Sequence, residues 1–200
     1  MPGIPSGTGS ESASSAPETL EPAWVEDVLR FWFEDIAPVD WFRKDEALDV
    51  RIRDRFLVLH ARLVAEDGGG AQTPRAMLAT VIVLDQFSRH LFRDGASAYA
   101  SDPIARRIAR SAIDLGFDAA MTVEERQFLY LPFEHSEDAG DQRLAVGLIA
   151  TLGDAEMSRY ATAHHDIIER FGRFPHRNAI LGRRSTPEEI AFLQSPMSSF

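Results

Sequence analysis

The sequence predicts an all-α protein of about eight or nine helices. Explicit helix starts are the first observation: Thr73, Asp102 and Thr186 each place a capping oxygen before a proline at the first helical position. Thr122 and Thr186 are also followed three residues later by glutamate, which is the capping-box pattern. These signals predict where several helices begin.

Apolar spacing is the second observation. One stripe at intervals of three and four residues, typical of a helix face, consists of Leu48, Ile52, Phe56, Leu59 and Leu63. The third observation is that no segment alternates apolar and polar residues over the length of a strand. Together they exclude a sheet protein.

The elements follow in order along the chain. Residues 1–22 are rich in Ser, Gly, Pro and Glu, which predicts a disordered acidic tail, and residues 23–200 are expected to form a single helical domain. The helix from Pro74 has almost no polar side chains up to Leu84, so we expect it to lie at the centre of the core. Further helices are expected at about 23–33, 103–115, 123–131, 141–152, 155–171 and 187–194.

Composition narrows the class of protein. Of the 200 residues, 44% are apolar and 26% are charged, as in a soluble globular domain. The formal charge of −10 and the absence of a long apolar run argue against a nucleic-acid surface and a membrane span. With no cysteine, disulfides and thiolate metal sites are excluded, and we expect a cytoplasmic location.

Three polar stretches interrupt this helical pattern. In the first, Asp85, Arg89 and Arg93 recur at intervals of four, which predicts one polar ladder on the end of the buried helix. It is either a salt-bridged helix face or part of a site.

In the second stretch, Pro132 is expected to break or kink the preceding helix after Leu131, so that the following polar residues lie at a helix junction. Glu134 and Glu137, or His135 and Asp138, could share a face there. Carboxylate and imidazole suit a metal ion, but no Glu-x-x-His pair or His-Glu-x-x-His motif is present, so we expect no metal.

The third stretch interleaves arginines with aromatic residues between His164 and Arg184. Arginines and aromatic faces together can bind a carboxylate, a phosphate or a base. The alternative is that these arginines pair internally with acidic residues and lock a helix junction. His164 lies on an apolar stripe, which is more typical of a core residue than of a ligand.

The same stretches resemble a known family, domain of unknown function 924, over about residues 28–200. The resemblance lies in Asp85-Gln-Phe-x-Arg89, in 130–137 (Tyr-Leu-Pro-Phe-Glu-His-Ser-Glu) and in the long motif from His164 to Asn178. It implies tetratricopeptide-like helical hairpins in a right-handed superhelix, and it implies no established activity. His165 and the acidic tail depart from the family pattern.

We expect these motifs to meet in one groove that binds an anionic small molecule or the carboxylate of a peptide or protein. Arginines would supply charge, histidines would exchange protons and glutamates would position both. The residues expected in the groove are Asp85, Gln86, Arg89, Arg93, Glu134, His135, Glu137, His164, Arg173, His176, Arg177 and Asn178.

Two alternatives stay open. One is an enzyme in which Glu134 or His135 acts as general base and arginines stabilise an anion. The other is a purely structural polar core. No cofactor, nucleic-acid partner or membrane partner is expected.

Overall fold

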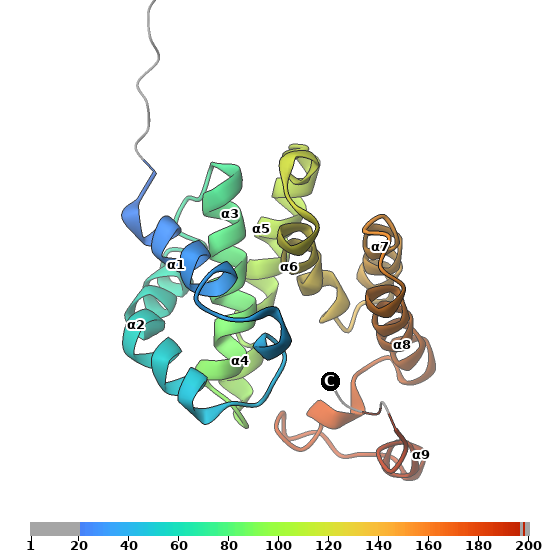
Figure 1. Ribbon diagram of the computed structural model, residues 1–200. Coiled ribbons are helices and arrows are strands. Elements are labelled where there is room, and N and C mark those ends of the chain that lie inside the picture. The colour runs from blue at the N-terminus through green and yellow to red at the C-terminus, as the bar shows by residue number, and fades with distance from the viewer. Residues whose placement is uncertain (1–20, 197, 199–200) are drawn as a thin grey trace, which may run out of the picture.

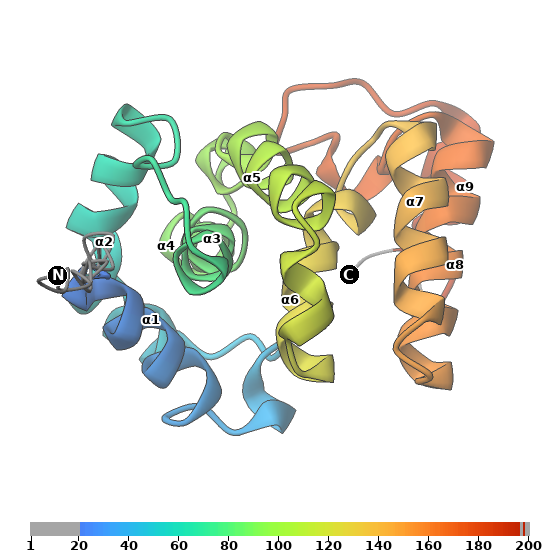
Figure 2. The same ribbon diagram turned by 90° about the horizontal axis from the view of Figure 1, so that it is seen from above.

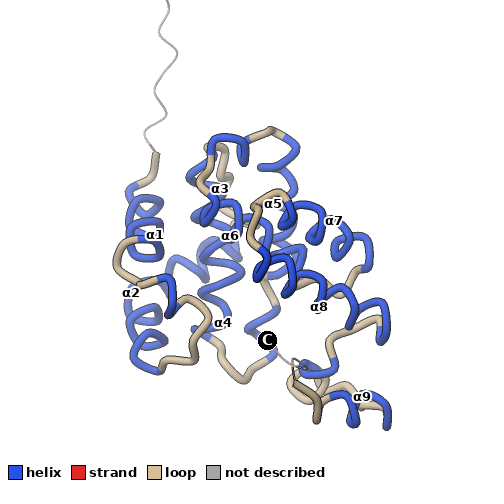
Figure 3. Tube along the Cα trace, turned by 45° about the vertical axis from the view of Figure 1, so that its right-hand side comes forward, coloured by secondary structure: helices blue, strands red, loops and turns tan. Residues whose placement is uncertain are grey.

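The computed structural model describes residues 21–196 and 198, and these residues contain helices and loops but no strand (Figure 3). The predicted all-α class is therefore confirmed. The tail predicted for residues 1–22 lies outside the described residues, apart from Glu21 and Pro22. The helical segments are α1 (Ala23–Phe33), α2 (Glu46–Ala65), α3 (Pro74–Val81), α4 (Ser88–Leu91), α5 (Asp102–Asp114), α6 (Val123–Glu134), α7 (Ala139–Ala150), α8 (Ala155–Phe171) and α9 (Pro187–Phe192).

The predicted helix caps are mostly confirmed. Thr73 accepts a hydrogen bond from the Ala76 amide, and Thr122 and Thr186 each complete a capping box. The cap predicted at Asp102 is wrong, because α5 already includes this residue and its carboxylate binds an arginine instead. A side chain that forms a strong ion pair is no longer available to the helix amides.

The predicted central helix is confirmed. Every residue from Ala76 to Ser88 is buried, and α3 packs against α1, α5 and α6 (Figure 2). A π-helical turn, Ile82–Phe87, joins α3 to α4, so that the chain is helical without a break from Pro74 to Leu91. Such wide turns are rare and are frequent at functional sites.

The predicted end of a helix before Pro132 is wrong. Helix α6 continues through this proline to Glu134. The missing N–H removes one hydrogen bond near the helix end. The proline is buried between Leu131 and Phe133, which are buried as well, and this apolar packing offsets the loss. The continuation places Glu134 in the last helical position and His135 at the cap, so both side chains have fixed directions.

The C-terminal part returns toward the first half of the chain. Helices α7 and α8 pack side by side, and at Gly172, with a φ of +67°, the chain leaves α8 (Figures 1 and 2). A small apolar cluster of Ile167, Ile168 and Phe174 anchors the returning segment. It brings the short helical turn Pro175–Arg177 against the end of α6, where an Arg177 Nη1–H donates to the His135 carbonyl at 2.9 Å. The tetratricopeptide-like superhelix stays a prediction.

Candidate functional site

A cavity of about 390 Å³ lies where the returning segment meets the ends of α4 and α6. Its lining contains five lysine or arginine residues and four histidines, but only one acidic residue among those described. The whole chain has a formal charge of −10, so this concentration of basic groups is local. The lining residues are Trp41, Phe42, Arg43, Lys44, Gln86, Arg89, His90, Arg93, Asp94, Ala98, Tyr99, His135, His164, His176, Arg177 and Ile180. We call this cavity the basic pocket.

Most cations of the basic pocket are neutralised by carboxylates beside it. Arg89 makes a two-pronged ion pair with Asp102, at 2.8 and 2.9 Å. Arg93 does the same with Asp49 of α2, at 2.7 and 2.6 Å. The predicted ladder is therefore correct for Asp85 and Arg89, which are 3.5 Å apart, and wrong for Arg93. Arg93 lies beyond the end of α4 and no longer follows the helical spacing.

Two cations at the edge of the pocket form weaker pairs. Lys44 Nζ lies 3.8 Å from a carboxylate oxygen of Asp94, and Arg43 pairs with Asp40 at 2.7 Å. Both basic side chains are more than 60% exposed, so solvent screens these pairs.

Arg177 differs from the other arginines of the pocket. It is 7% exposed, and no described carboxylate lies within 4.0 Å of its guanidinium. Its Nε–H is buried with no hydrogen-bond acceptor among the described residues. The guanidinium carbon lies 4.6 Å from the centre of the Tyr99 ring and 4.4 Å from that of Phe174. These cation–π contacts offset part of the cost of burying the charge.

Burial lowers the pKa of Arg177, and the nearby Arg89 lowers it further. An arginine nevertheless keeps its proton in a protein. One Nη1–H is bonded to the His135 carbonyl oxygen, and the buried Nε–H is left without an acceptor among the described residues.

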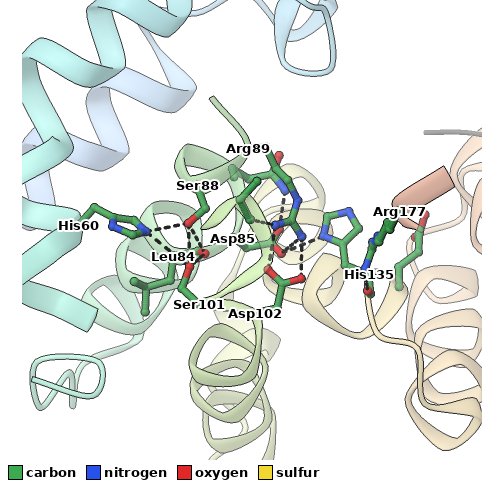
Figure 4. A network of polar contacts seen from close by, with 12 residues as sticks. His60, Leu84, Asp85, Ser88, Arg89, Ser101, Asp102, His135 and Arg177 are labelled. Atoms are coloured by element: carbon green, nitrogen blue, oxygen red, sulfur yellow. Dashed lines mark hydrogen bonds and ion pairs between the residues drawn. The ribbon is translucent and has the colours of Figure 1, made fainter. Parts of the chain in front are cut away.

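Asp85 and His135 form the second distinctive contact of the site (Figure 4). Asp85 lies in the π-helical turn and is completely buried, and its Oδ1 lies 2.8 Å from the Nδ1 of His135. Burial alone would raise the pKa of Asp85, but His135 and Arg89 outweigh it and lower the pKa to about 2. A carboxylate can only accept hydrogen bonds, so the His135 proton in this contact is on Nδ1.

His164 is held in a similar way from the other side of the pocket. Its Nδ1 lies 2.9 Å from the Tyr160 carbonyl oxygen and 3.0 Å from a carboxylate oxygen of Glu134. The His164 ring is 6.4 Å from the ring of His135, measured between centroids. Adjacent residues at the end of α6, Glu134 and His135, thus contribute to two carboxylate–imidazole contacts.

His176 completes the group of imidazoles. Burial lowers its pKa to about 4, with further contributions from Arg177 and His164. The His176 ring is therefore neutral at pH 7.

The remaining predicted site residues do not line the basic pocket. Arg173 makes a two-pronged pair with Glu189 of α9, at 2.6 and 2.8 Å, and Asn178 donates to the same carboxylate at 3.3 Å. Glu137 accepts two hydrogen bonds from Arg183, at 2.6 and 2.9 Å. Arg173 and Arg183 are thus paired with acidic residues of the same chain, as the structural alternative predicts. Arg177 has no such carboxylate partner among the described residues.

Several residues of the pocket were not among the predicted ones. Trp41 and Phe42 lie in a loop between α1 and α2, and Tyr99 lies between α4 and α5. Asp49 and Asp102 hold two arginines in place from outside the lining. Neither the three lining residues nor the two carboxylates follow a sequence spacing that points to a site, because each of their contacts joins segments that are distant in the sequence.

No group of three or more metal-ligating side chains is close enough to hold a metal ion in residues 21–196 and 198. Within the same part of the chain, no helix is long and apolar enough to cross a bilayer.

Comparison with known proteins identifies the family. A family model described as "Bacterial protein of unknown function (DUF924)" matches residues 28–197. A solved structure of a protein of unknown function from Agrobacterium tumefaciens is 43% identical, with a TM-score of 0.81, and the match covers 86% of this chain and 97% of that one. No curated protein matches significantly. The chain therefore belongs to the bacterial family of unknown function DUF924.

Proposed function

We propose that the basic pocket binds a small anionic molecule through Arg177. The observation that supports this function most strongly is the buried guanidinium without a carboxylate partner among the described residues. Leaving buried hydrogen-bond donors unpaired is costly, and a bound carboxylate or phosphate would remove that cost. The planar guanidinium fits the two oxygens of either group.

The rest of the pocket suits such a ligand. Its volume of about 390 Å³ is in the range of small-molecule sites. Tyr99 and Trp41 offer aromatic surface beside the cations. This compact shape favours a small molecule over an extended peptide, and the cytoplasmic location expected from the sequence stays a prediction.

An enzyme is the second candidate, and the contact between Asp85 and His135 favours it. A buried carboxylate that fixes one imidazole nitrogen leaves the other available to exchange a proton with a ligand.

A thermal-shift screen with inorganic phosphate, phenylphosphate, succinate and benzoate tests the proposal. A ligand at 100 times its dissociation constant adds about 2.7 kcal/mol to the free energy of unfolding, which raises the midpoint by roughly 5–10 °C for a chain of this size. We expect such a shift in the wild type and its loss in Arg177→Met.

The matched control is Arg55→Met. Arg55 also stacks on two aromatic rings, those of Phe31 and Phe56, but it pairs with Asp27 and lies outside the basic pocket. The control should keep the ligand-induced shift. No shift with any of the four probes in the wild type would refute binding of these anion classes. An early-melting Arg177→Met that still responds to the probes would assign Arg177 to the structure.

A further inference from the structure

We propose that the basic pocket binds a doubly charged anion, a phosphate monoester or a dicarboxylate, and that His135 Nε2 takes up one proton when the anion binds. This inference rests on the proposed anion site, to which it adds the charge of the ligand and a proton-transfer residue.

The geometry around His135 fixes which nitrogen can act. Nδ1 donates to Asp85, which is completely buried and held by Gln86 Nε2 at 2.6 Å. The imidazole ring can therefore gain a proton only on Nε2. Among the described residues, Nε2 has no hydrogen-bond partner, and the ring lines the basic pocket. A histidine with a purely structural role would be expected to have both nitrogens satisfied.

The charges around the ring explain why a proton is needed. Beside His135, the carboxylates of Asp85 and Asp102 balance the guanidinium groups of Arg89 and Arg177, and the adjacent Glu134 adds a carboxylate that is paired with His164. These groups leave no surplus positive charge next to the ring for the second negative charge of a doubly charged ligand. Protonation of His135 supplies one positive charge at the place where the ligand binds.

Other titratable groups face the same ring. From α8, His164 lies 6.4 Å away and is paired with Glu134, and from the short turn after α8, His176 is neutral at pH 7. Glu137 contributes to the potential at this turn but is paired with Arg183. Among these imidazoles, only that of His135 is bonded to a completely buried carboxylate.

His135 takes up the proton without losing its contact with Asp85. Neutral His135, with its proton on Nδ1, accepts a second proton on Nε2 from the solvent, where the acid form of the buffer loses it. The ring becomes an imidazolium, Nδ1–H remains bonded to Asp85, and the bound anion contacts both the imidazolium and the Arg177 guanidinium. For a ligand that undergoes a reaction, the protonated Nε2 would be the proton donor.

Calorimetric titration of the full-length protein with succinate, which is a dianion at neutral pH, tests the inference. The titration is run at pH 7.2 in PIPES and in Tris, two buffers with very different heats of ionisation. A difference in binding heat between the buffers gives the number of protons taken up. We expect uptake of up to one proton in the wild type, and affinity that falls by up to tenfold per pH unit between pH 6 and 8.

Two variants test whether His135 is the residue that takes up the proton. His135→Gln should bind succinate at least tenfold more weakly, with no difference between the buffers, and Asp85→Asn should reduce the uptake. Uptake that persists in His135→Gln would assign the proton to another group and overturn the inference. If His135→Gln does not fold, NMR of the His135 ring in the wild type replaces it, because succinate should shift its Cε1–H signal to the imidazolium position.

The outcomes separate the two proposals. Binding of succinate or phenylphosphate without proton uptake would overturn the inference and leave the anion site in place. Binding of benzoate alone, a single negative charge, would also overturn it. No binding of any probe by the wild type would overturn the anion site itself, and the inference with it.

Discussion

The Nδ1 atom of His135 lies 2.8 Å from Oδ1 of Asp85, a residue 50 positions earlier in the chain. The contact joins the end of α6 to the π-helical turn between α3 and α4 (Figure 4). Asp85 in turn contacts Arg89, and Arg89 contacts Asp102 of α5. A polar network thus runs through the core and ends at the basic pocket.

Acid unfolding should depend on Asp85. Because its folded-state pKa of about 2 lies below the ordinary value of 3.8, the ionised carboxylate contributes stability that is complete above pH 4 and is lost as the pH falls through 2. The contribution is on the order of 2 kcal/mol. Denaturant unfolding between pH 5 and 2 should show a shallower loss for Asp85→Asn than for the wild type. Exposed Asp166→Asn is the control, and equal slopes for all three proteins would contradict the role of Asp85.

His176 should cause a loss of stability as the pH falls from 6.5 to 4, which is above the pH range in which Asp85 acts. Its pKa is lowered from 6.5 to about 4, so the unfolded chain binds a proton more tightly than the folded protein does. Stability is therefore lost as the pH falls from 6.5 to 4, by up to about 3 kcal/mol. In His176→Gln this part of the loss should disappear, as measured by urea unfolding at several pH values. A variant with the same pH dependence as the wild type would show that His176 is not kept neutral by burial.

Arg173 and Arg177 should respond differently to substitution. Arg173→Met leaves the buried Glu189 carboxylate, whose pKa Arg173 lowers to about 2, without its main partner. We expect the thermal midpoint to fall by several degrees with no effect on anion binding. Arg177→Met should lose anion binding with a smaller change in stability, because no carboxylate among the described residues is left unpaired.

The opposite pattern would support the structural alternative for the pocket. A loss of roughly 2–4 kcal/mol in Arg177→Met, measured by denaturant unfolding, would mean that its charge holds the fold together.

A buried hydroxyl network beside α4 should contribute to stability independently of the pocket. Ser88 Oγ lies 2.8 Å from His60 Nε2, and it donates to the Leu84 carbonyl oxygen at 2.8 Å, as Ser101 does at 2.6 Å. Ser88→Ala leaves the buried His60 nitrogen without this partner and should lower the free energy of unfolding by about 1–3 kcal/mol.

The control for the hydroxyl network is Ser111→Ala, in which a surface hydroxyl bonded within its own helix is removed. It should change stability by less than about 0.5 kcal/mol. A Ser88→Ala variant as stable as this control would show that the network contributes nothing.

Local patterns were sufficient to predict most of the fold. The capping sequences at Thr122 and Thr186 and the apolar run after Pro74 each specify an element through contacts within a few residues. The local pattern predicts Pro132 wrongly because the effect of this proline depends on its burial. It predicts Asp102 wrongly because the carboxylate pairs with Arg89 instead of capping its own helix. In both cases a tertiary contact outweighs the local preference.

The site was predictable only in part, for the same reason. Gln86, Arg89 and His135 stand in motifs that are unusual for a helical core, and they do line the basic pocket. Nothing in the sequence separates Arg177, which lacks a carboxylate partner among the described residues, from Arg173, which has Glu189. Which arginine is paired depends on how the returning segment docks, and that is a property of the folded chain.

The most direct test of the anion site is an NMR spectrum of the arginine Nε–Hε groups during titration with succinate or phenylphosphate. The Arg177 signal is assigned by its absence from Arg177→Lys. We predict that this buried Nε–H, which has no acceptor among the described residues, shifts first and saturates with the bound fraction of ligand. An unchanged Arg177 signal while other arginines shift, or no shift at all at saturating probe, would contradict the account.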